Sequence, residues 1–242
     1  MPLPWIRSEL VPVRRADQIQ RFLACLQDAQ NAFVRSFGPV TTFSTEFSLR
    51  EDVLGIRGPV VDSVTGETLS PAQQFQRLLV RPDNLSSARV VGLGFTTSIG
   101  SENTVFSYDL CNESIAGVSV RLIGDGLGDD EAEVRLTHGG TSQVRSCESW
   151  RNGHEEIVNQ YTLLPRRVVL PASVNVSSSA MDTQLFGRAV AATNWRIEIN
   201  PTSGTNRDLV LENIEDIVLR ITYQGHSVGA TSIGYAPVCA GL

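Results

Sequence analysis

The feature that most constrains the fold is a long succession of short β-type patterns between Arg89 and Tyr223. Apolar and polar residues alternate over short runs, and turn signals such as Asn152-Gly153 separate the runs. No helical period intervenes. Many short strands without helices between them are typical of a sandwich or jelly roll. We therefore predict an all-β fold, an antiparallel β-sandwich or jelly-roll-like domain.

The clearest strands lie near the end of this region. Trp195, Ile197 and Ile199 alternate with polar residues, which predicts a half-buried strand. Residues 217–223 are β-branched and nearly all apolar, which predicts an inner strand covered on both faces, and 208–211 predicts a short strand between the two. The other predicted strands are 40–49, 89–97, 105–110, 114–123, 131–138, 143–147, 157–164, 166–170 and 185–190.

One long helix is predicted over residues 14–37, after an extended arm at 1–13. Its apolar residues recur at spacings of three and four, and Gly38-Pro39 ends it. These apolar residues are Ile19, Phe22, Leu23, Leu26, Ala29, Phe33 and Phe37. We interpret this stripe as core packing; the alternative is the end of a longer helical element from which the β domain hangs.

A second, short helix is predicted over 71–80, where Ser70 and Gln73 form a capping box around Pro71. The resulting domain organisation is an N-terminal arm and helix (1–38), a β-sandwich domain (39–225) and a C-terminal tail (226–242).

Composition and charge limit the classes of partner that the protein can bind. The 242 residues carry a net charge of −6, which argues against a nucleic-acid partner. All 20 basic residues are Arg, so the chain is lysine-free, as Arg codons in a GC-rich genome would explain. No run of 18 apolar residues predicts a membrane span. Without a signal-peptide pattern at the N-terminus, we expect synthesis in the cytoplasm, with release as part of a large complex as the route outside.

The cysteines are Cys25, Cys111, Cys147 and Cys239, and no two of them have a metal-ligand spacing. We favour four reduced, buried thiols; the alternative is a Cys111–Cys147 pair in a protein that ends up outside the cell.

Cys147, with His138 or His154 as its base, is the candidate for a cysteine-dependent hydrolase. No local sequence signature supports that reaction, and no G-x-S-x-G turn is present. We therefore interpret the chain as not an enzyme, with no cofactor.

An acidic loop is the candidate for a metal site. Asp125, Asp129, Asp130 and Glu131 cluster between two predicted strands, and clustered carboxylates are ligands that calcium prefers. Their spacing is not that of an EF-hand. A hairpin tip kept soluble by its carboxylates is the competing interpretation.

Aromatic residues give a second candidate function. Jelly rolls often bind sugars on Trp or Tyr platforms, and Trp150, Tyr161 and Tyr235 lie in loop-like or strand-end positions. The alternative function is therefore a carbohydrate-binding module, with calcium as its ion.

Two motifs resemble a known family. Trp195-Arg-Ile-Glu-Ile precedes the segment Ile214 to Tyr223, and Ile115 to Leu122 reads I-x-x-V-x-V-x-L. This arrangement is similar to the C-terminal B-component-binding domain of the A component of bacterial toxin complexes (the Tc family).

The resemblance spans about residues 100–225 and implies a β-sandwich without catalytic residues. In that family the domain docks another protein subunit onto a pore-forming component involved in virulence. The resemblance therefore implies a protein-binding assembly module whose partner is another subunit of a toxin-like bacterial complex. Arg166 and Arg167 are the exposed charges that we expect at such a binding surface.

Overall fold

A computed structural model describes residues 10–79, 91–98, 106, 110–128, 131–147, 158–176, 181–192 and 194–227. In chain order the elements are α1 (Leu10–Phe37), β1 (Val40–Ser48), the π-helical turn η1 (Leu49–Val53), β2 (Val60–Val61), β3 (Thr68–Leu69), α2 (Pro71–Leu79), β4 (Val91–Phe95), β5 (Leu110–Ile123), β6 (Glu131–His138), β7 (Thr141–Arg145), β8 (Val158–Thr162), β9 (Arg166–Val174), β10 (Ala191–Ala192), β11 (Trp195–Ile199), the 3-10 turns η2 (Gly204–Asn206) and η3 (Leu211–Asn213), and β12 (Asp216–Ser227). No helix in these ranges is long and apolar enough to cross a membrane.

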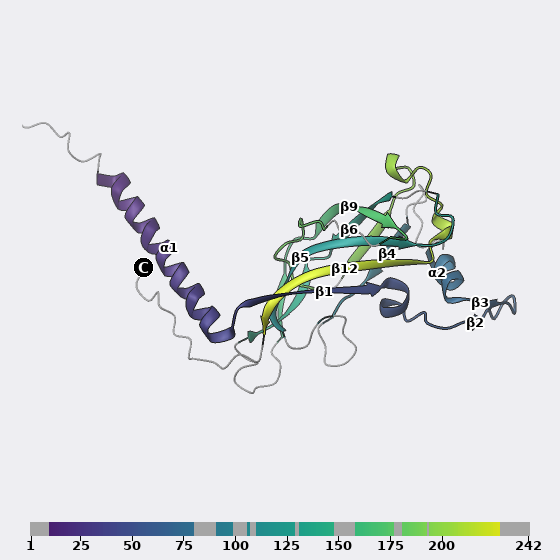
Figure 1. Cartoon of the computed structure of the whole chain (residues 1–242), viewed down its shortest axis with the longest axis horizontal. Helices are drawn as coiled ribbons and strands as arrows, with labels where there is room; N and C mark the ends of the chain where they lie inside the picture. The colour runs from purple at the N-terminus through teal and green to yellow at the C-terminus, as the bar shows by residue number, and fades with distance from the viewer. Residues whose placement is uncertain are drawn as a thin grey trace, which may run out of the picture.

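Seven strands form the main sheet, in the spatial order β1-β12-β5-β9-β6-β11-β4 (Figure 1). Strands β10, β7 and β8 form a smaller sheet, and β2 and β3 a short hairpin. The predicted all-β fold class is confirmed. The main sheet is mixed rather than wholly antiparallel, because β9 runs parallel to β5. Parallel neighbours need a crossover connection, and here the chain from β6 to β8 supplies it.

The main sheet curls until its two edges approach each other. Phe47 lies on the edge strand β1 and Phe95 on the opposite edge strand β4, yet their ring centroids are 6.4 Å apart. Trp195 stacks on Phe95 at 5.8 Å, and Phe106 contacts both Phe47 and Tyr223. These buried rings fill the inside of the curled sheet, so the core lies between β1 and β4 rather than under a separate layer.

The inward rows follow from the alternation of the strands. Phe47, Leu219 and Val120 occupy matched register positions on β1, β12 and β5, and all three are buried. In the other half of the sheet, Leu136 of β6 pairs with Ile197 of β11, and both side chains are buried in the same core. Because successive strand residues point to opposite faces, each strand places every second side chain in this core.

The local signals for the short helix are confirmed in detail. The Ser70 backbone N–H donates to Gln73 Oε1 at 2.8 Å, and the Gln73 N–H donates to Ser70 Oγ at 3.2 Å. This reciprocal pair is the predicted capping box. Phe75 and Leu79 are the buried residues of α2 and join the main core.

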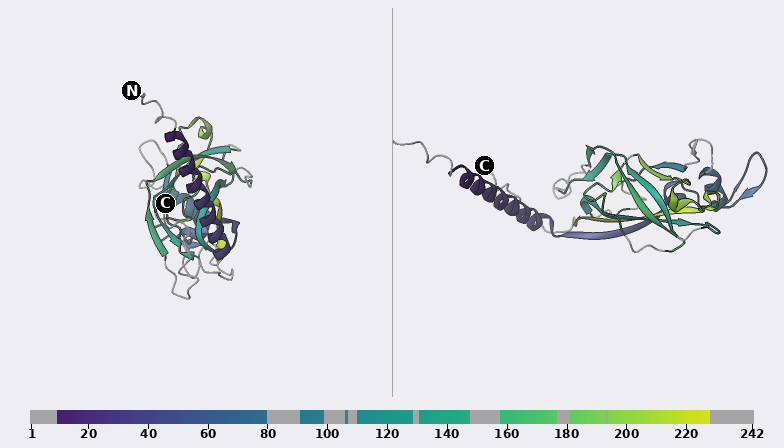
Figure 2. Two further views of the ribbon diagram at one scale, coloured as in Figure 1. Left: turned by 90° about the vertical axis from the view of Figure 1, so that its left-hand side faces the viewer. Right: turned by 90° about the horizontal axis from the view of Figure 1, so that it is seen from above.

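The long helix differs from its prediction in both extent and environment. Helix α1 begins at Leu10, inside the segment predicted as an extended arm. It leads away from the β domain instead of lying on it (Figures 1 and 2). Ile19, Phe22, Leu23 and Leu26 are 49–59% exposed, so the interpretation of this stripe as core packing is wrong for these residues. The period of the pattern is helical, but period alone does not say what covers the apolar face.

Two predicted strands are turns. Within 185–190, the Gly187 N–H donates to the Ile115 carbonyl and the Ile115 N–H donates to the Arg188 carbonyl, so this segment docks as a tight turn on β5. Within 208–211, the Leu209 N–H donates to the Asn206 carbonyl. Both segments bury apolar side chains without a strand ladder, which explains why hydrophobicity alone suggested strands.

Strand β12 is longer and less covered than predicted. It continues to Ser227, two residues past the predicted domain boundary at 225. It is an inner strand between β1 and β5, as predicted. On its outer face, however, Arg220 and Thr222 are only partly buried, so the prediction of full cover on both faces is wrong at these positions. The outer face of the main sheet at β12 is therefore partly exposed to solvent.

Candidate docking surface

The junction of α1, β1 and β12 lies at one end of the β domain (Figure 1). The Gly38 N–H donates to the Val34 carbonyl at 2.8 Å and closes the helix, and Gly38 has φ of +81°, a conformation that favours glycine at a helix end. The Gly38 carbonyl accepts a hydrogen bond from His226 Nδ1 at 2.9 Å. The last turn of α1 is thereby tied to the end of β12, and the chain turns directly into β1.

Strand β1 is an open edge of the main sheet. All nine of its residues pair with β12, from Val40 with His226 to Ser48 with Val218, and no strand of the described residues pairs with its other side. Val40 is 49% exposed and Phe43 is 36% exposed, although Phe43 stacks on Tyr223 at 6.0 Å. β-Branched and aromatic residues dominate this strand, and Glu46 is its one charged residue. A long edge with few charges is able to pair with another strand.

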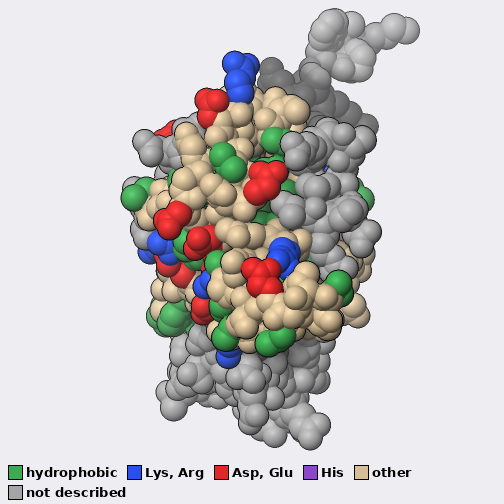
Figure 3. Space-filling model, turned by 90° about the vertical axis from the view of Figure 1, so that its right-hand side faces the viewer, with side chains coloured by type: hydrophobic (Ala, Val, Ile, Leu, Met, Phe, Trp, Pro, Cys, Tyr) green, Lys and Arg blue, Asp and Glu red, His purple; other side chains and the backbone are tan. Residues whose placement is uncertain are grey.

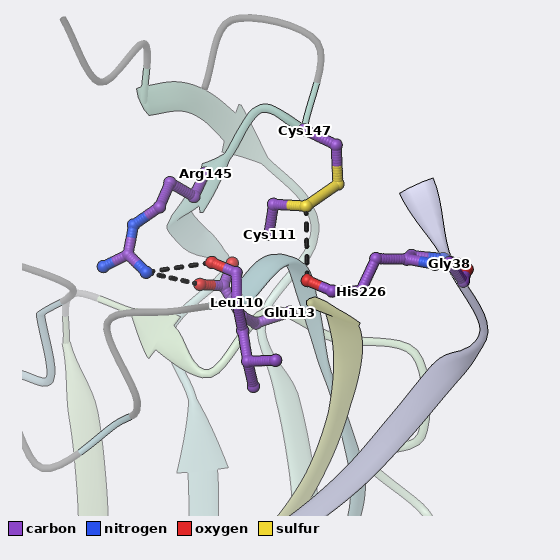
Figure 4. The surroundings of a disulfide bond; sticks show 7 residues. All are labelled: Gly38, Leu110, Cys111, Glu113, Arg145, Cys147 and His226. Carbon is purple, nitrogen blue, oxygen red and sulfur yellow. Dashed lines mark hydrogen bonds and ion pairs between the residues drawn. A yellow bond between two sulfur atoms is a disulfide. The ribbon is translucent and has the colours of Figure 1, made fainter. Parts of the chain in front are cut away.

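A disulfide fixes the corner beneath this junction. Cys111 at the start of β5 bonds to Cys147, just after β7, with an S–S length of 2.03 Å (Figure 4). Cys111 Sγ also lies 3.4 Å from the His226 carbonyl oxygen. The bond therefore joins the two sheets next to the point where β12 meets α1. The favoured prediction of four reduced thiols is wrong for this pair, and Cys25 is also disulfide-bonded.

A buried ion pair supports the same corner. Arg145 and Glu113 have side chains that are each 1% exposed, and Arg145 Nη1 lies 3.2 Å from Glu113 Oε1. The same nitrogen donates to the Leu110 carbonyl at 2.9 Å (Figure 4). Charges this deeply buried need both a partner and hydrogen bonds. The pair and the disulfide together hold β7 against the first residues of β5.

The hydrolase hypothesis does not fit this geometry. The Cys147 sulfur is bonded to Cys111, so it is not a free thiolate. His138 is fully buried, its Nε2 lies 3.0 Å from the Ala189 carbonyl and its ring meets Trp195 edge-on. Burial lowers the pKa of His138, and the positive charge of Arg188 lowers it further. His138 is therefore a neutral core residue, and His154 lies outside the described residues.

The predicted partner-binding arginines lie at the start of β9. Arg167 is exposed and forms an ion pair with Glu198 of the neighbouring region of the sheet at 3.5 Å. Arg166 is exposed and pairs in register with His138. Burial lowers the pKa of Arg188, and the charge of Arg166 nearby lowers it further. Arg167 lies in the outward row of β9 with the exposed Val169, whereas Arg166 lies at the strand start in the row of the buried Val168. The role of Arg166 and Arg167 in binding stays a prediction.

At the opposite end of the β domain from α1, no one type of side chain predominates on the described surface. Around β2, β3 and α2, acidic, basic and apolar side chains are interspersed (Figure 3). Arg77 there forms ion pairs with Asp62 at 2.7 Å and with Glu67 at 3.0 Å. Such a mixed surface is typical of a solvated face.

The acidic loop is only partly described. Asp125 is exposed in the turn after β5, and Glu131 is exposed at the start of β6. Asp129 and Asp130 lie outside the described residues. Among the residues that are described, no three His, Cys, Asp or Glu side chains are placed to hold a metal ion. The calcium hypothesis stays a prediction.

The three aromatic residues of the carbohydrate hypothesis are not brought together by described contacts. Tyr161 lies on β8 and is 49% exposed. Trp150 and Tyr235 lie outside the described residues, so this hypothesis also stays a prediction.

The edge character of β1 was not readable from the sequence. The alternation of residues 40–49 predicted a strand there, and Phe47 and Leu49 are buried as expected. Which neighbours a strand has is set by distant residues, here those of β12. The scarcity of charge within β1 was the one local signal for an open pairing edge.

Comparison with known proteins finds only distant structural likenesses. No family model matches the chain, and no curated protein matches it. Two Tc toxin structures are similar. TcdA4 of Morganella morganii is 18% identical with a TM-score of 0.44, and the match covers 77% of this chain and 7% of that chain. TcaA-TcaB of Yersinia pseudotuberculosis is 15% identical with a TM-score of 0.40, and the match covers 84% of this chain and 11% of that chain.

A virus structure is similar as well. The Turnip Yellow Mosaic Virus structure is 10% identical, with a TM-score of 0.25, over 78% of this chain and 94% of that chain. The chain thus spans about a tenth or less of the Tc chains but most of the viral one. At TM-scores below 0.5, none of these likenesses carries a statement about activity.

Proposed function

We propose that this chain is a non-catalytic docking module that binds another protein subunit of a toxin-complex-like bacterial assembly. The observation that carries the proposal is the open β1 edge, which pairs with β12 along all nine residues and exposes Val40 and Phe43. An extended segment of the partner adds to this edge as a further strand. The sequence resemblance to a docking domain supports the same class of function.

The backbone groups available to the partner follow from the strand period. The Ser48 N–H donates to Asp52 Oδ2 at 2.8 Å, which directs it away from β12. In an antiparallel strand, alternate residues direct both N–H and C=O to the same side. Thr42, Ser44 and Glu46 therefore offer their N–H and C=O groups to an added strand, while Phe43 offers an apolar contact beside it.

The disulfides support a final location outside the reducing cytosol. Cys111 and Cys147 are bonded, and such bonds persist in oxidising compartments and on released proteins. A docking module of a released complex fits this chemistry.

The test uses the subunits encoded by neighbouring genes as the binding partners. Thr42→Pro removes one donor from the open edge and leaves the β12 side of the strand intact. We expect it to weaken the Kd of the complex by about tenfold or more, equivalent to about 1.4 kcal/mol or more. Thr42→Ser keeps the donor and serves as the matched control.

Amide hydrogen exchange supplies the second readout. Binding should slow exchange at Thr42, Ser44 and Glu46 in the wild-type chain. Equal affinity of Thr42→Pro and wild type, with both variants folded, would place docking on another surface. No binding by any of these subunits would overturn the docking function itself.

A further inference from the structure

The exposed stripe on α1 lacks a described cover. Ile19, Phe22, Leu23 and Leu26 are each about half exposed or more and lie on adjacent turns of one helix face. In the described ranges, no element lies over this stripe (Figures 1 and 2). A contiguous exposed apolar surface of this kind marks a contact site.

A disulfide on the same helix identifies the occupant. Cys25 follows Phe22 by three residues, which places it at the border of the stripe on a helix of 3.6 residues per turn, and it is disulfide-bonded. The chain has four cysteines, and Cys111 and Cys147 bond to each other. We propose that the C-terminal segment 228–242 lies along α1, covers its apolar stripe and is locked there by a Cys25–Cys239 bond.

The reach of the chain supports this arrangement. His226 Nδ1 donates to the Gly38 carbonyl at 2.9 Å, so β12 ends beside the base of α1. Cys25 precedes Gly38 by 13 residues, which is about 20 Å along a helix. Cys239 follows Ser227 by 12 residues, which reach about 40 Å when extended. The extended segment from Ser227 to Cys239 is therefore longer than the helix length from Gly38 to Cys25 that it has to span.

The composition of the segment suits an apolar face. In a chain with 19% charged residues, 228–242 contains no charged side chain. Ile233, Tyr235 and Val238 supply apolar groups close in sequence to Cys239. A segment that stays in solvent is usually rich in charge, whereas this one offers apolar groups to a stripe that needs cover. Burial of both surfaces, together with the bond, anchors α1 to the end of the β domain.

The pairing is tested first by peptide mapping of the full chain without reduction. We expect one linked peptide pair that contains Cys25 and Cys239, and a second that contains Cys111 and Cys147. A link from Cys25 to Cys111 or Cys147 would overturn the proposal.

The cover is tested separately in the full chain with all cysteines kept. Ile233→Asp/Val238→Asp should speed amide exchange in residues 18–30 by about tenfold or more and increase binding of a hydrophobic dye. Thr231→Asp adds charge at a polar position and is the matched control. Unchanged exchange and dye binding in Ile233→Asp/Val238→Asp would contradict the proposal.

A second copy of the chain is the competing occupant. Light scattering on the wild-type chain and on Phe22→Ser distinguishes it. A dimer that dissociates in Phe22→Ser, without any effect of Ile233→Asp/Val238→Asp on exchange, would assign the stripe to self-association and reject the C-terminal segment.

Discussion

His138 is the residue whose chemistry differs most from its appearance in the sequence. In the sequence it was a candidate base; in the structure it is buried against Trp195, with Nε2 facing the Ala189 carbonyl. The Gly140 N–H reaches Nδ1 at 3.3 Å, and Arg188 Nη1 lies 3.4 Å from the same nitrogen. Nδ1 is thus an acceptor, and a proton on it would face the Gly140 N–H and the positively charged guanidinium of Arg188.

This environment predicts acid sensitivity. Burial first, and Arg188 second, keep the pKa of His138 below its ordinary value of 6.5. The unfolded chain therefore binds a proton before the folded chain does. The stability that this difference provides is complete above about pH 6.5 and is lost as the pH falls towards the folded pKa, at about 1.4 kcal/mol for each unit between the two pKa values.

Urea unfolding between pH 8 and pH 5 measures the effect. Wild type should lose stability over this range, and His138→Gln should show a flatter profile, even if it is less stable throughout. Parallel profiles for the two proteins would show that His138 does not titrate on unfolding.

Leu219 is a core residue of β12 whose substitution tests the assigned core. It is fully buried and lies opposite Phe47 in the register with β1. Leu219→Ala should cost about 2–5 kcal/mol in the free energy of unfolding, because it leaves a cavity among packed side chains. Val169→Ala, at a position that is 46% exposed, should cost less than about 0.5 kcal/mol. Denaturant titration of both variants tests this, and equal costs would contradict the assigned core.

At the level of elements, the β5–β7 corner depends on a covalent link. The Cys111–Cys147 bond spans 36 residues of sequence and lies beside the buried Arg145–Glu113 pair. Reducing it frees the loop in the unfolded state and removes a constraint where β12 meets α1. The smaller sheet, β10-β7-β8, is joined to the main sheet at this corner.

Replacement of both cysteines by Ser measures this link. The chain-entropy relation for a loop of this length predicts a loss of about 4 kcal/mol in the free energy of unfolding. Cys111→Ser/Cys147→Ser should therefore unfold at a markedly lower urea concentration than oxidised wild type. An unchanged midpoint would mean that the corner is held by packing and the ion pair alone.

Elements with local signals were the ones that could be predicted. The capping box of α2, the alternation of β11 and the strand β6 agree with their predicted positions. Segments 185–190 and 208–211 were predicted as strands, but their backbones bond within turns or to other segments. Their apolar content reports burial, which turns and strands share, so no local pattern separates the two.

At the level of the whole molecule, the curl of the main sheet and the position of β1 set what the chain can bind. Phe47 and Phe95 close the core across the two edge strands, but no described strand pairs with the outer backbone side of β1. Helix α1 continues from this edge and away from the domain (Figure 2). The proposed docking edge and the proposed cover of α1 therefore lie at the same end of the molecule but on different elements.

The all-β class, most strand positions, the helical period of α1 and the capping box of α2 could be predicted, because each depends on residues a few positions apart. The parallel pairing of β5 and β9, the edge position of β1, the Cys111–Cys147 bond and the exposure of the stripe on α1 appear only in the folded chain. Each of these depends on residues far apart in the chain that meet only after folding. The candidate docking surface belongs to this second group, because an open edge is defined by which strand lies beside it.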